Sequence, residues 1–459
     1  MTLIKSISGI RGTIGGNPGE GLTPLDIVKF SSAYAQWLKT QTPKNRYKVI
    51  IGRDARISGE MVERIVTGTL TGMGVDVVSL GLATTPTVEI AVLKEHANGG
   101  IIITASHNPG HWNALKLLNN IGEFLSAEDG ENIIDLTLND SYLYADVEQI
   151  GKISIDLKYS DIHINDILAL KLVKPGLIKQ AGFRIAIDCV NSVGGIIIPK
   201  LLKALGVKEV YELNCIPDGI FPHNPEPLPE NLSEISSLVK EKKADVGFVV
   251  DPDVDRLAII SEDGSMFGEE YTLVAVADYV LDKTPGNTAS NLSSSRALRD
   301  ITIAKGQKYF SAPVGEVNVV NIMKANHCVI GGEGNGGIIY PELHYGRDAL
   351  VGIGLFLSFL AEKKLNCSEL RKTFPEYVIS KNKIVLSEGM DMDTIFNAVK
   401  EEFKSEKIDT RDGIKIDLTN GWIHLRKSNT EPILRIYTEA VNLSMAKELA
   451  QRIVKKIKG

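Results

Sequence analysis

The sequence predicts the α/β class of fold, because short apolar runs rich in β-branched residues alternate with longer stretches of helical periodicity. Apolar runs that end in a glycine or a polar loop occur at 47–51, 101–103, 184–187, 246–250 and 328–330. Helical periodicity is clear over 25–39, after Thr23 as a cap and Pro24, and over 231–242. This alternation indicates mostly parallel or mixed sheets with helices on both faces. Ligand-binding loops then gather beyond the carboxyl ends of the strands.

A chain of 459 residues, 43% of them hydrophobic, is long enough for two to four domains. Polar, irregular stretches indicate three joints between domains. We therefore predict domains at 1–153, 154–261, 262–375 and 376–459. The last domain has an α+β texture, because apolar runs at 422–425 and 433–437 precede a periodic helix at 443–457, with Asn442 as its cap.

The composition excludes several partner classes. A net charge of −6 and a pI near 5.9 give no general attraction to nucleic acid or to anionic membranes. The sequence shows neither a signal peptide nor an apolar run that would span a bilayer. The cysteines are far apart, which favours a reducing compartment. We expect a cytoplasmic protein that binds a small molecule, with monomer and homodimer both left open.

The run Ile-Ile-Ile-Thr-Ala-Ser-His-Asn-Pro at 101–109 ends a predicted buried strand at Ser106. A serine at the end of a buried strand is a candidate nucleophile. Its neighbour His107 is not automatically its base, because adjacent side chains point in different directions. Serine and Asn-Pro also form ordinary turns, so a plain turn is the alternative. We call residues 104–109 the serine loop.

Asp251, Asp253 and Asp255, the aspartate triad, follow another apolar strand. An extended backbone would direct alternate side chains to one side, so we expect the three carboxylates to meet. Oxygen ligands without cysteine or histidine favour Mg²⁺, and Arg256, as a supporting residue, would balance charge or hold a phosphate. An exposed acidic turn is the alternative, and an Asp-x-Asp phosphatase loop is a rival weakened by the third aspartate.

Two further loops carry polar residues suited to a phosphorylated sugar. The phosphate loop, residues 426–432, contains a guanidinium, hydroxyls and amides, as a phosphate-binding loop requires. Its candidate ligands are Arg426, Ser428, Asn429 and Thr430, with Arg435 shortly after. The glycine-rich sugar loop, residues 331–337, offers Glu333 to sugar hydroxyls. Structural turns are the alternatives for both loops, and the G-x-G-x-x-G spacing is accidental because a strand and Pro341 follow.

Two basic segments near the N terminus complete the set of candidates. In Ser8-Gly-Ile-Arg-Gly, Arg11 would reach a phosphate. In the segment 52–59, Arg53 and Arg56 are expected to form a structural ion-pair network with Asp54 rather than to touch a ligand.

Taken together, in this order from Ser8 to Arg435, these segments resemble the α-D-phosphohexomutase superfamily of phosphoglucomutases, phosphomannomutases and phosphoglucosamine mutases. The resemblance implies three tandem related α/β domains with mixed sheets and a C-terminal α+β domain around a central cleft. It implies one Mg²⁺ bound by Ser106 and the aspartate triad. It also implies that Glu333 and Asn335 meet the sugar, and that the phosphate loop holds the distant phosphate.

The resemblance further implies an isomerase that interconverts hexose 6-phosphate and hexose 1-phosphate through phosphoserine at Ser106 and a bound hexose bisphosphate. Lys116 is kept although Ala114 replaces the usual glycine, so Lys116 is the expected proton-transfer group and His107 its competitor. As a proton acceptor, Lys116 would need a lowered pKa.

In the sugar loop, Asn335 occupies the position where the family commonly has serine. By this resemblance we rank glucosamine phosphate first among the substrates, with glucose or mannose phosphate as the alternative. A metal-dependent sugar phosphatase and a silent sugar-phosphate-binding protein are the remaining rivals.

Overall fold

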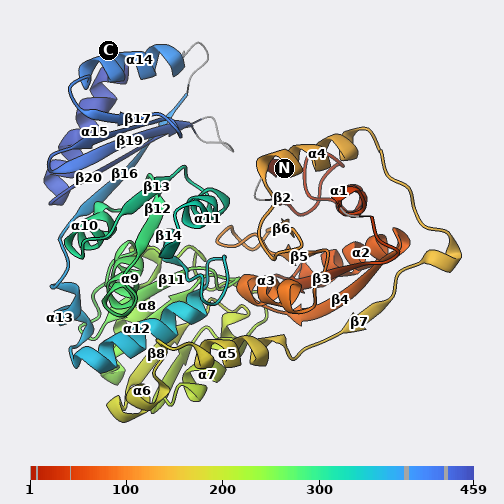
Figure 1. Ribbon diagram of the computed structural model, residues 1–459, viewed down its shortest axis with the longest axis horizontal. Coiled ribbons are helices and arrows are strands. Elements are labelled where there is room, and N and C mark those ends of the chain that lie inside the picture. The colour runs from red at the N-terminus through yellow and green to blue at the C-terminus, as the bar shows by residue number, and fades with distance from the viewer. Residues whose placement is uncertain (1, 7–8, 42, 387–391, 428–432, 459) are drawn as a thin grey trace. The chain divides into compact units, whose positions relative to one another are not determined.

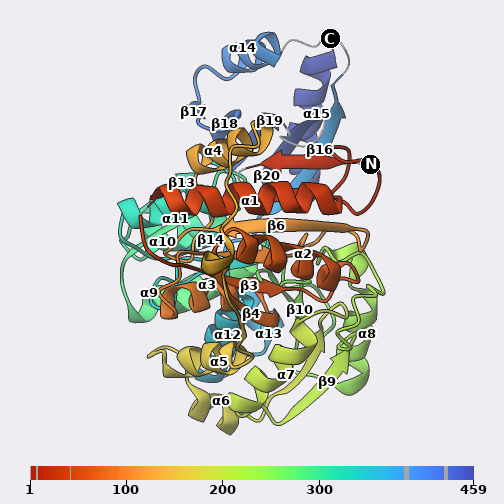
Figure 2. The same cartoon turned by 90° about the vertical axis from the view of Figure 1, so that its right-hand side faces the viewer.

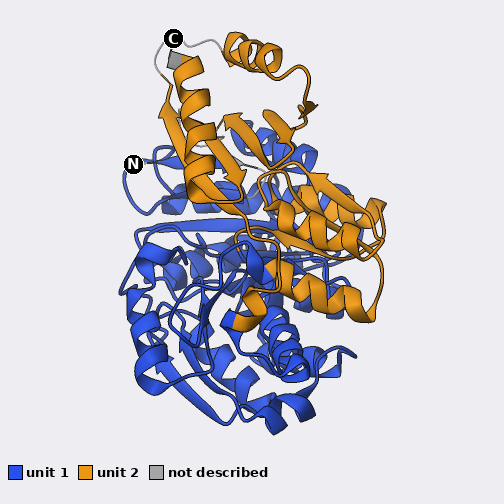
Figure 3. Ribbon diagram, turned by 90° about the vertical axis from the view of Figure 1, so that its left-hand side faces the viewer, with its two compact units in different colours: residues 1–272, 336–368 blue, residues 273–335, 369–459 orange. Residues whose placement is uncertain are grey.

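The structure is a computed structural model that describes the chain except for residues 1, 7–8, 42, 387–391, 428–432 and 459 (Figure 1). Unit 1 contains residues 1–272 and 336–368, and unit 2 contains residues 273–335 and 369–459 (Figure 3). Two helices, α9 (Tyr271–Lys283) and α13 (Cys367–Arg371), lie where the chain passes from one unit to the other.

The first sheet of unit 1 is mixed and has the strand order β1-β2-β6-β5-β3-β4-β7. Its strands are β1 (Leu3–Ser6), β2 (Gly9–Thr13), β3 (Tyr47–Arg53), β4 (Val75–Leu82), β5 (Gly99–Ile103), β6 (Trp112–Leu118) and β7 (Ile153–Ile155). β3 is parallel to both β4 and β5, whereas β6 is antiparallel to both β5 and β2. The apolar runs at 47–51 and 101–103 therefore form central strands, as predicted.

Helices cover both faces of this sheet. They are α1 (Pro24–Gln41), α2 (Gly59–Gly72), α3 (Thr85–Lys94) and α4 (Ala127–Leu138), and the 3-10 turn η1 (Val147–Gln149) follows. One core joins α1, α2 and α4 to inward-facing residues of the sheet such as Val49 and Ile51, and α1 and α4 lie side by side (Figure 2). Helix α3 packs against the opposite face, where Val92 meets Gly100. The predicted cap of α1 is present, because the Thr23 hydroxyl accepts the Asp26 N–H at 3.4 Å.

The second sheet of unit 1 has the order β11-β10-β8-β9, with β10 antiparallel to β11 and parallel to β8. Its strands are β8 (Arg184–Asp188), β9 (Glu209–Leu213), β10 (Val246–Val250) and β11 (Leu257–Ser261). The helices near it are α5 (Tyr159–Ala169), α6 (Pro175–Ala181), α7 (Gly194–Ala204), η2 (Pro229–Asn231) and α8 (Ser233–Lys242). Unit 1 also contains β15 (Gly337–Ile339) and the almost wholly apolar, buried helix α12 (Ala349–Lys363).

Unit 2 begins with a parallel arrangement in which β12 pairs with both β13 and β14. The elements are β12 (Asn287–Asn291), α10 (Arg296–Ala304), β13 (Tyr309–Ala312), α11 (Glu316–Ala325) and β14 (Cys328–Glu333). Glu333 is the last residue of β14, so the sugar loop begins at the carboxyl end of a parallel strand, where ligand loops gather.

The remainder of unit 2 is an antiparallel sheet with the order β16-β20-β19-β18-β17. Its elements are β16 (Val378–Val385), α14 (Met392–Glu402), β17 (Lys407–Asp409), β18 (Ile414–Leu418), β19 (Gly421–Lys427), β20 (Ile433–Ala440) and α15 (Leu443–Lys458). One apolar face, including Ile423 and Leu425, packs against α14 and α15. Asn442 caps α15 as predicted, because its Oδ1 accepts the Met445 N–H at 3.0 Å.

The predicted fold class is confirmed: α/β sheets are followed by a C-terminal antiparallel sheet with two helices. The four domain boundaries stay predictions. Across the described ranges, no helix combines the length and the apolar character needed to cross a bilayer.

Candidate active site

The serine loop leaves the carboxyl end of β5 and places Ser106 in a buried position with a left-handed φ of 48°. The Ser106 hydroxyl donates to Asp251 Oδ2 at 2.7 Å. The Ser106 N–H donates to the Thr104 hydroxyl at 2.9 Å, and that hydroxyl donates to Asp54 Oδ2 at 2.6 Å. A non-glycine residue at positive φ is strained, so this conformation depends on the contacts that hold the loop.

Arg56 provides most of those contacts. Its buried guanidinium pairs with Asp54 at 3.0 Å and donates to the backbone carbonyls of Ser106, Asn108 (2.6 Å) and Pro109 (2.7 Å). The predicted ion pair between Arg56 and Asp54 is thus present, whereas Arg53 pairs with Glu63 at 2.9 Å instead. The role of Arg56 in holding the serine loop was missed. The only local signal was an arginine two residues after the aspartate that follows β3.

The aspartate triad lies in a turn, so the expected extended backbone is wrong although the carboxylates do meet. Val254 adopts a φ of 62°, and its N–H donates to the Asp251 carbonyl at 3.1 Å. One carboxylate oxygen from each aspartate lies within 4.8 Å of the others, and all three side chains are buried. The turn brings the carboxylates together by folding the chain back on itself, which strand alternation does not describe.

Three side chains from other parts of unit 1 bind the triad. Lys116 of β6 pairs with Asp253 at 2.6 Å and with Asp255 at 3.4 Å. The Thr85 hydroxyl donates to Asp253 Oδ2 at 2.7 Å, and Arg347 donates to Asp255 Oδ2 at 2.7 Å. Thr85 and Arg347 were missed by the sequence analysis. Neither lies in a motif, and their partners are 168 and 92 residues away.

The donor set suits a divalent cation. Asp253 Oδ1 and Asp255 Oδ1 are buried and have no hydrogen-bond partner among the described residues. Buried carboxylate oxygens without partners are costly, and oxygen ligands are those that Mg²⁺ prefers. Arg256 lies at the edge, with Nε 4.0 Å from Asp251 and 3.8 Å from Asp255. The triad therefore fits a Mg²⁺ site.

The pKa values of this group reflect its dense charges. Burial and the two neighbouring aspartates raise the pKa of Asp251 well above its usual range. Burial lowers the pKa of Lys116, but the charges of Asp253 and Asp255 outweigh it and leave that pKa raised. A proton-accepting lysine needs the opposite shift, so in this state Lys116 holds its proton.

His107 and Arg11 both lie beside the serine loop. His107 Nδ1 is 3.3 Å from Ser106 Oγ, so these two side chains do meet although they are adjacent in the sequence. The charge of Arg256, with burial and Arg11, holds the pKa of His107 well below its usual range. Arg11 donates to Asn108 Oδ1 at 2.8 Å.

In unit 2, Glu333 is buried and firmly held. Its Oε1 accepts the Asn291 side-chain N–H at 2.8 Å and the Gly315 backbone N–H at 3.1 Å. Asn335 Nδ2 lies 3.5 Å from Glu333 Oε2. The Gly334 N–H donates to the Ser294 hydroxyl at 3.1 Å. The sugar loop is thus anchored to the segment that follows β12.

The phosphate-loop residue Arg426 stands in a row of cations. In the register of the sheet, Arg426 is opposite Arg435 on β20, and Arg435 is opposite Lys383 on β16. Directly opposite residues share one face of a sheet, and like charges placed so repel each other. Arg426 Nε pairs with Asp412 at 3.2 Å. The predicted ligands Ser428, Asn429 and Thr430 lie outside the described residues.

The predicted site residues therefore form two groups. Unit 1 brings together Ser106, the triad, Lys116, His107, Arg11 and Arg256. Unit 2 holds Glu333 with Asn335, and separately Arg426 beside Arg435.

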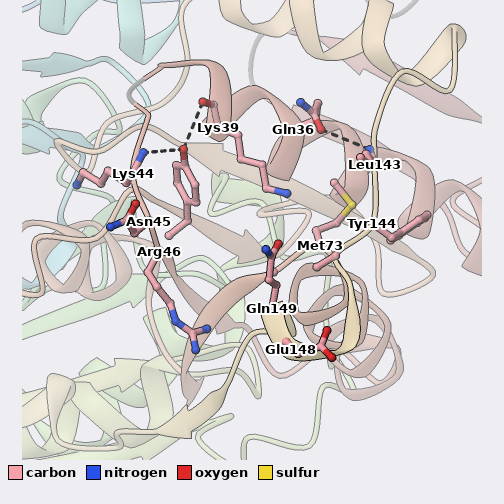
Figure 4. Close-up of a pocket in the computed structure, with 13 residues that line it drawn as sticks. Gln36, Lys39, Lys44, Asn45, Arg46, Met73, Leu143, Tyr144, Glu148 and Gln149 are labelled. Atoms are coloured by element: carbon pink, nitrogen blue, oxygen red, sulfur yellow. Dashed lines mark hydrogen bonds between the residues drawn. The ribbon is translucent and has the colours of Figure 1, made fainter.

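A cavity of about 550 Å³ lies elsewhere in unit 1, among the ends of α1 and α2 and the chain around η1 (Figure 4). The Tyr47 hydroxyl accepts the Lys44 backbone N–H at 3.0 Å and donates to the Lys39 carbonyl at 3.4 Å. None of the predicted site residues that the structure describes lines this cavity.

Comparison with known proteins matches the whole length of the chain. Family models described as phosphoglucomutase/phosphomannomutase match in order: alpha/beta/alpha domain I over residues 3–143, domain II over 161–264, domain III over 268–377 and the C-terminal domain over 382–456.

Named relatives and a solved structure agree with these matches. A phosphoglucomutase/phosphomannomutase of Thermococcus kodakarensis is 36% identical over 97% of each chain, and a probable phosphoglucosamine mutase of Methanopyrus kandleri is 32% identical over 97% of this chain and 96% of its own. A phosphoglucomutase/phosphomannomutase family protein from Burkholderia thailandensis has the same fold, with a TM-score of 0.84 at 24% identity over 100% of this chain and 98% of its own.

Proposed function

Because the chain belongs to the phosphoglucomutase/phosphomannomutase family, and so is a phosphohexomutase of the isomerase class, we propose that it works through a phosphorylated Ser106 and a bound hexose bisphosphate. One observation carries this proposal: the Ser106 hydroxyl is bonded to Asp251, inside a buried cluster that also contains Lys116. A serine among carboxylates and a lysine, with a metal site beside it, is suited to carry a phosphoryl group.

Each half-reaction moves one phosphoryl group. A sugar hydroxyl attacks the phosphorus of phosphorylated Ser106, the bond from phosphorus to Oγ breaks, and the hydroxyl proton passes to a base. The bisphosphate then turns over, and its other phosphate returns to Oγ by the same steps in reverse. The backbone clamp of Arg56 keeps Oγ in place throughout, which matters because transfer depends on alignment.

The aspartate triad would hold Mg²⁺, which when bound stabilises the charge on the transferring phosphoryl oxygens. Thr85 and Arg347 orient Asp253 and Asp255 through the oxygens that face the protein. Both carboxylates keep an oxygen for the cation in this arrangement. A phosphoserine adds about −1.5 to −2 charges at neutral pH, so Arg11 and Arg256 are needed beside it.

Lys116 is the proposed proton-transfer group, and His107 is its competitor. Lys116 is bonded to two triad members, and His107 contacts Ser106 directly. Variants Lys116→Gln and His107→Gln, each followed across pH, separate the two roles. The acid/base residue is the one whose replacement removes a limb of the pH profile.

At the substrate end, Glu333 and Asn335 would accept the sugar hydroxyls. Arg426, Ser428, Asn429, Thr430 and Arg435 would hold the phosphate that does not react. The row of cations across β16, β20 and β19 supports this, because its repulsion falls when an anion binds. The same loops must accept both orientations of the bisphosphate.

We rank glucosamine phosphate as the preferred substrate, because Asn335 replaces the common serine and the Methanopyrus kandleri relative is named a probable phosphoglucosamine mutase. The 36% identical Thermococcus kodakarensis relative favours glucose or mannose phosphate instead. Parallel turnover of glucosamine, glucose, N-acetylglucosamine and mannose phosphates decides between them. Fastest conversion of glucosamine 6-phosphate supports the ranking, and preference for glucose or mannose overturns it.

A further inference from the structure

A closed ring of hydrogen bonds in unit 2 connects Glu333 to Asp412. From Glu333, the first route runs through Gly315, whose N–H donates to Oε1 at 3.1 Å. The preceding residue, Val314, donates its N–H to Asp412 Oδ2 at 2.9 Å. Two successive backbone amides thus bind two carboxylates, one from the sugar loop and one from the turn between β17 and β18.

The second route returns from Asp412 to Glu333 through a histidine. His424 Nε2 binds the Asp412 carbonyl at 2.8 Å, and His424 Nδ1 binds the Ser293 hydroxyl at 2.8 Å. The Ser293 N–H donates to Asn291 Oδ1 at 2.9 Å, and Asn291 donates to Glu333 Oε1 at 2.8 Å. The ring therefore joins the two parts of unit 2 that carry the sugar loop and the phosphate loop.

The directions of these bonds are fixed. Burial lowers the pKa of His424 to about 4, so at neutral pH the imidazole of His424 is uncharged and carries one N–H. A carbonyl only accepts, so Nε2 carries the hydrogen and Nδ1 accepts from Ser293. Each group in the ring then has its partner, and a fully satisfied polar network is rigid.

Two glycines allow the ring to close. Gly413 has a φ of 71°, and a Cβ there would lie 2.1 Å from the Leu425 carbonyl oxygen. This close approach lets Asp412 reach Arg426 on the neighbouring strand. Gly315 has a φ of 119°, which turns its N–H toward Glu333.

We propose that Asp412 is a positioning residue for the phosphohexomutase reaction, which holds Arg426 at a fixed spacing from Glu333. The proposal rests on the roles given above to Arg426 and Glu333. Arg426 Nε binds Asp412 at 3.2 Å, and a guanidinium has two further nitrogens with which it can bind a phosphate. A bound bisphosphate must meet a sugar ligand and a phosphate ligand at once, and a displacement of about 1 Å can cost about a hundredfold in rate.

The test compares Asp412→Asn, Arg426→Ala and the double variant, with Asp417→Asn on β18 as the matched control. Steady-state kcat and KM are measured with glucosamine 6-phosphate and with glucose 1-phosphate, together with inhibition by inorganic phosphate. We expect Asp412→Asn to raise KM and the inhibition constant by about tenfold, the usual size for residues that orient a ligand group. When Asp412→Asn is added to Arg426→Ala, KM and the inhibition constant should rise almost no further than in Arg426→Ala alone. Asp412 acts through the guanidinium of Arg426, which the double variant lacks.

Each outcome bears on one proposal. An ordinary KM in Arg426→Ala contradicts the phosphate role of Arg426 itself. A raised KM in Arg426→Ala with wild-type kinetics in Asp412→Asn overturns the positioning role alone, and so do effects that multiply in the double variant.

If Asp412→Asn lowers the melting temperature, the pair His424→Gln and His424→Leu tests the ring from the other side. Glutamine keeps a donor for the Asp412 carbonyl and should stay near wild type, whereas leucine should raise KM. Equal KM values in that pair would also overturn the proposal.

Discussion

The two groups of site residues treat charge in opposite ways. Around Ser106, opposite charges interleave in a buried network: the aspartate triad meets Lys116 and Arg347 within hydrogen-bonding distance. On the C-terminal sheet, like charges stand next to each other, with Arg426, Arg435 and Lys383 in one row. The charges around Ser106 thus compensate one another, whereas the cations of the row repel one another in part, and a phosphate bound there, as proposed above, would reduce that repulsion.

The largest expected effect comes from the transfer end. Ser106→Ala removes the proposed carrier and should lower turnover by more than about a thousandfold, because no other group takes over covalent transfer. Folding should be almost unchanged, since the backbone clamp of Arg56 remains. The measurement is hexose 1-phosphate formed per minute by purified protein with a wild-type melting curve. Near-normal turnover would remove Ser106 from the mechanism.

Asp253→Asn should come next. The change removes a triad charge and leaves Lys116 with a weaker partner, so we expect activity to fall about a hundredfold and the Mg²⁺ concentration for half activation to rise. Activity is titrated with Mg²⁺ after chelation, and Asp263→Asn, in the exposed turn after β11, is the control. An unchanged Mg²⁺ titration would count against the triad as the metal site.

Arg426→Ala should have a smaller and different effect. Loss of a charged phosphate ligand should raise KM by about ten- to a hundredfold and change kcat little, because the reacting atoms keep their positions. Lys407→Ala, an exposed cation on β17, serves as the control. If Arg426→Ala lowers kcat as strongly as Asp253→Asn does, the proposed difference in role between the residues around Ser106 and the row of cations is contradicted.

A last effect concerns stability rather than turnover, and it appears at alkaline pH, where two buried groups, one in each unit, should act in opposite directions. In unit 1, burial lowers the pKa of His344, but its bonds to Asp348 and Glu89 outweigh this and raise it to about 10. Stability from His344 is thus complete below its ordinary pKa of 6.5 and is lost as pH rises through about 10. In unit 2, burial lowers the pKa of Lys415 to about 8. The free-energy cost of burying the charged Lys415 side chain therefore disappears as pH rises from 8 toward the ordinary pKa of 10.5.

Melting curves from pH 6.5 to 10.5 test this pair. At about 1.4 kcal/mol per pKa unit, the His344 contribution is at most about 5 kcal/mol. His344→Gln should flatten the alkaline loss of stability, and Lys415→Met should remove the opposing gain. Profiles parallel to wild type in both variants would contradict these assignments.

Much of the site could be predicted because local patterns place loops at strand ends. The apolar runs before Ser106 and before Asp251 form β5 and β10, and their polar continuations are the serine loop and the triad. The terminal helix and its Asn442 cap followed from periodicity and a local hydrogen bond. These features depend on neighbours within a few residues.

The missed features depend on partners far along the chain. Thr85 and Arg347 carry no motif, and their bonds to the triad exist only because separate segments pack together. The backbone around Val254 was expected to be extended, but it forms a turn. No residue pattern in this segment predicts a valine at positive φ. The pairing of Lys116 with two aspartates reversed the expected direction of its pKa for the same reason.

The central claim is that Ser106 carries the phosphoryl group, and intact-protein mass spectrometry tests it most directly. Wild-type protein incubated with glucose 1,6-bisphosphate and Mg²⁺ should gain the mass of one phosphoryl group, mapped by fragmentation to Ser106. When the transferred phosphate is radioactive, excess unlabelled hexose 6-phosphate should move the label into hexose phosphate while the phosphorylated mass remains, because each turnover returns a phosphate to Ser106. Ser106→Ala should never acquire the mass or the label. A wild-type protein that turns over substrate without acquiring phosphate at Ser106, or that acquires it at another residue, would contradict the account.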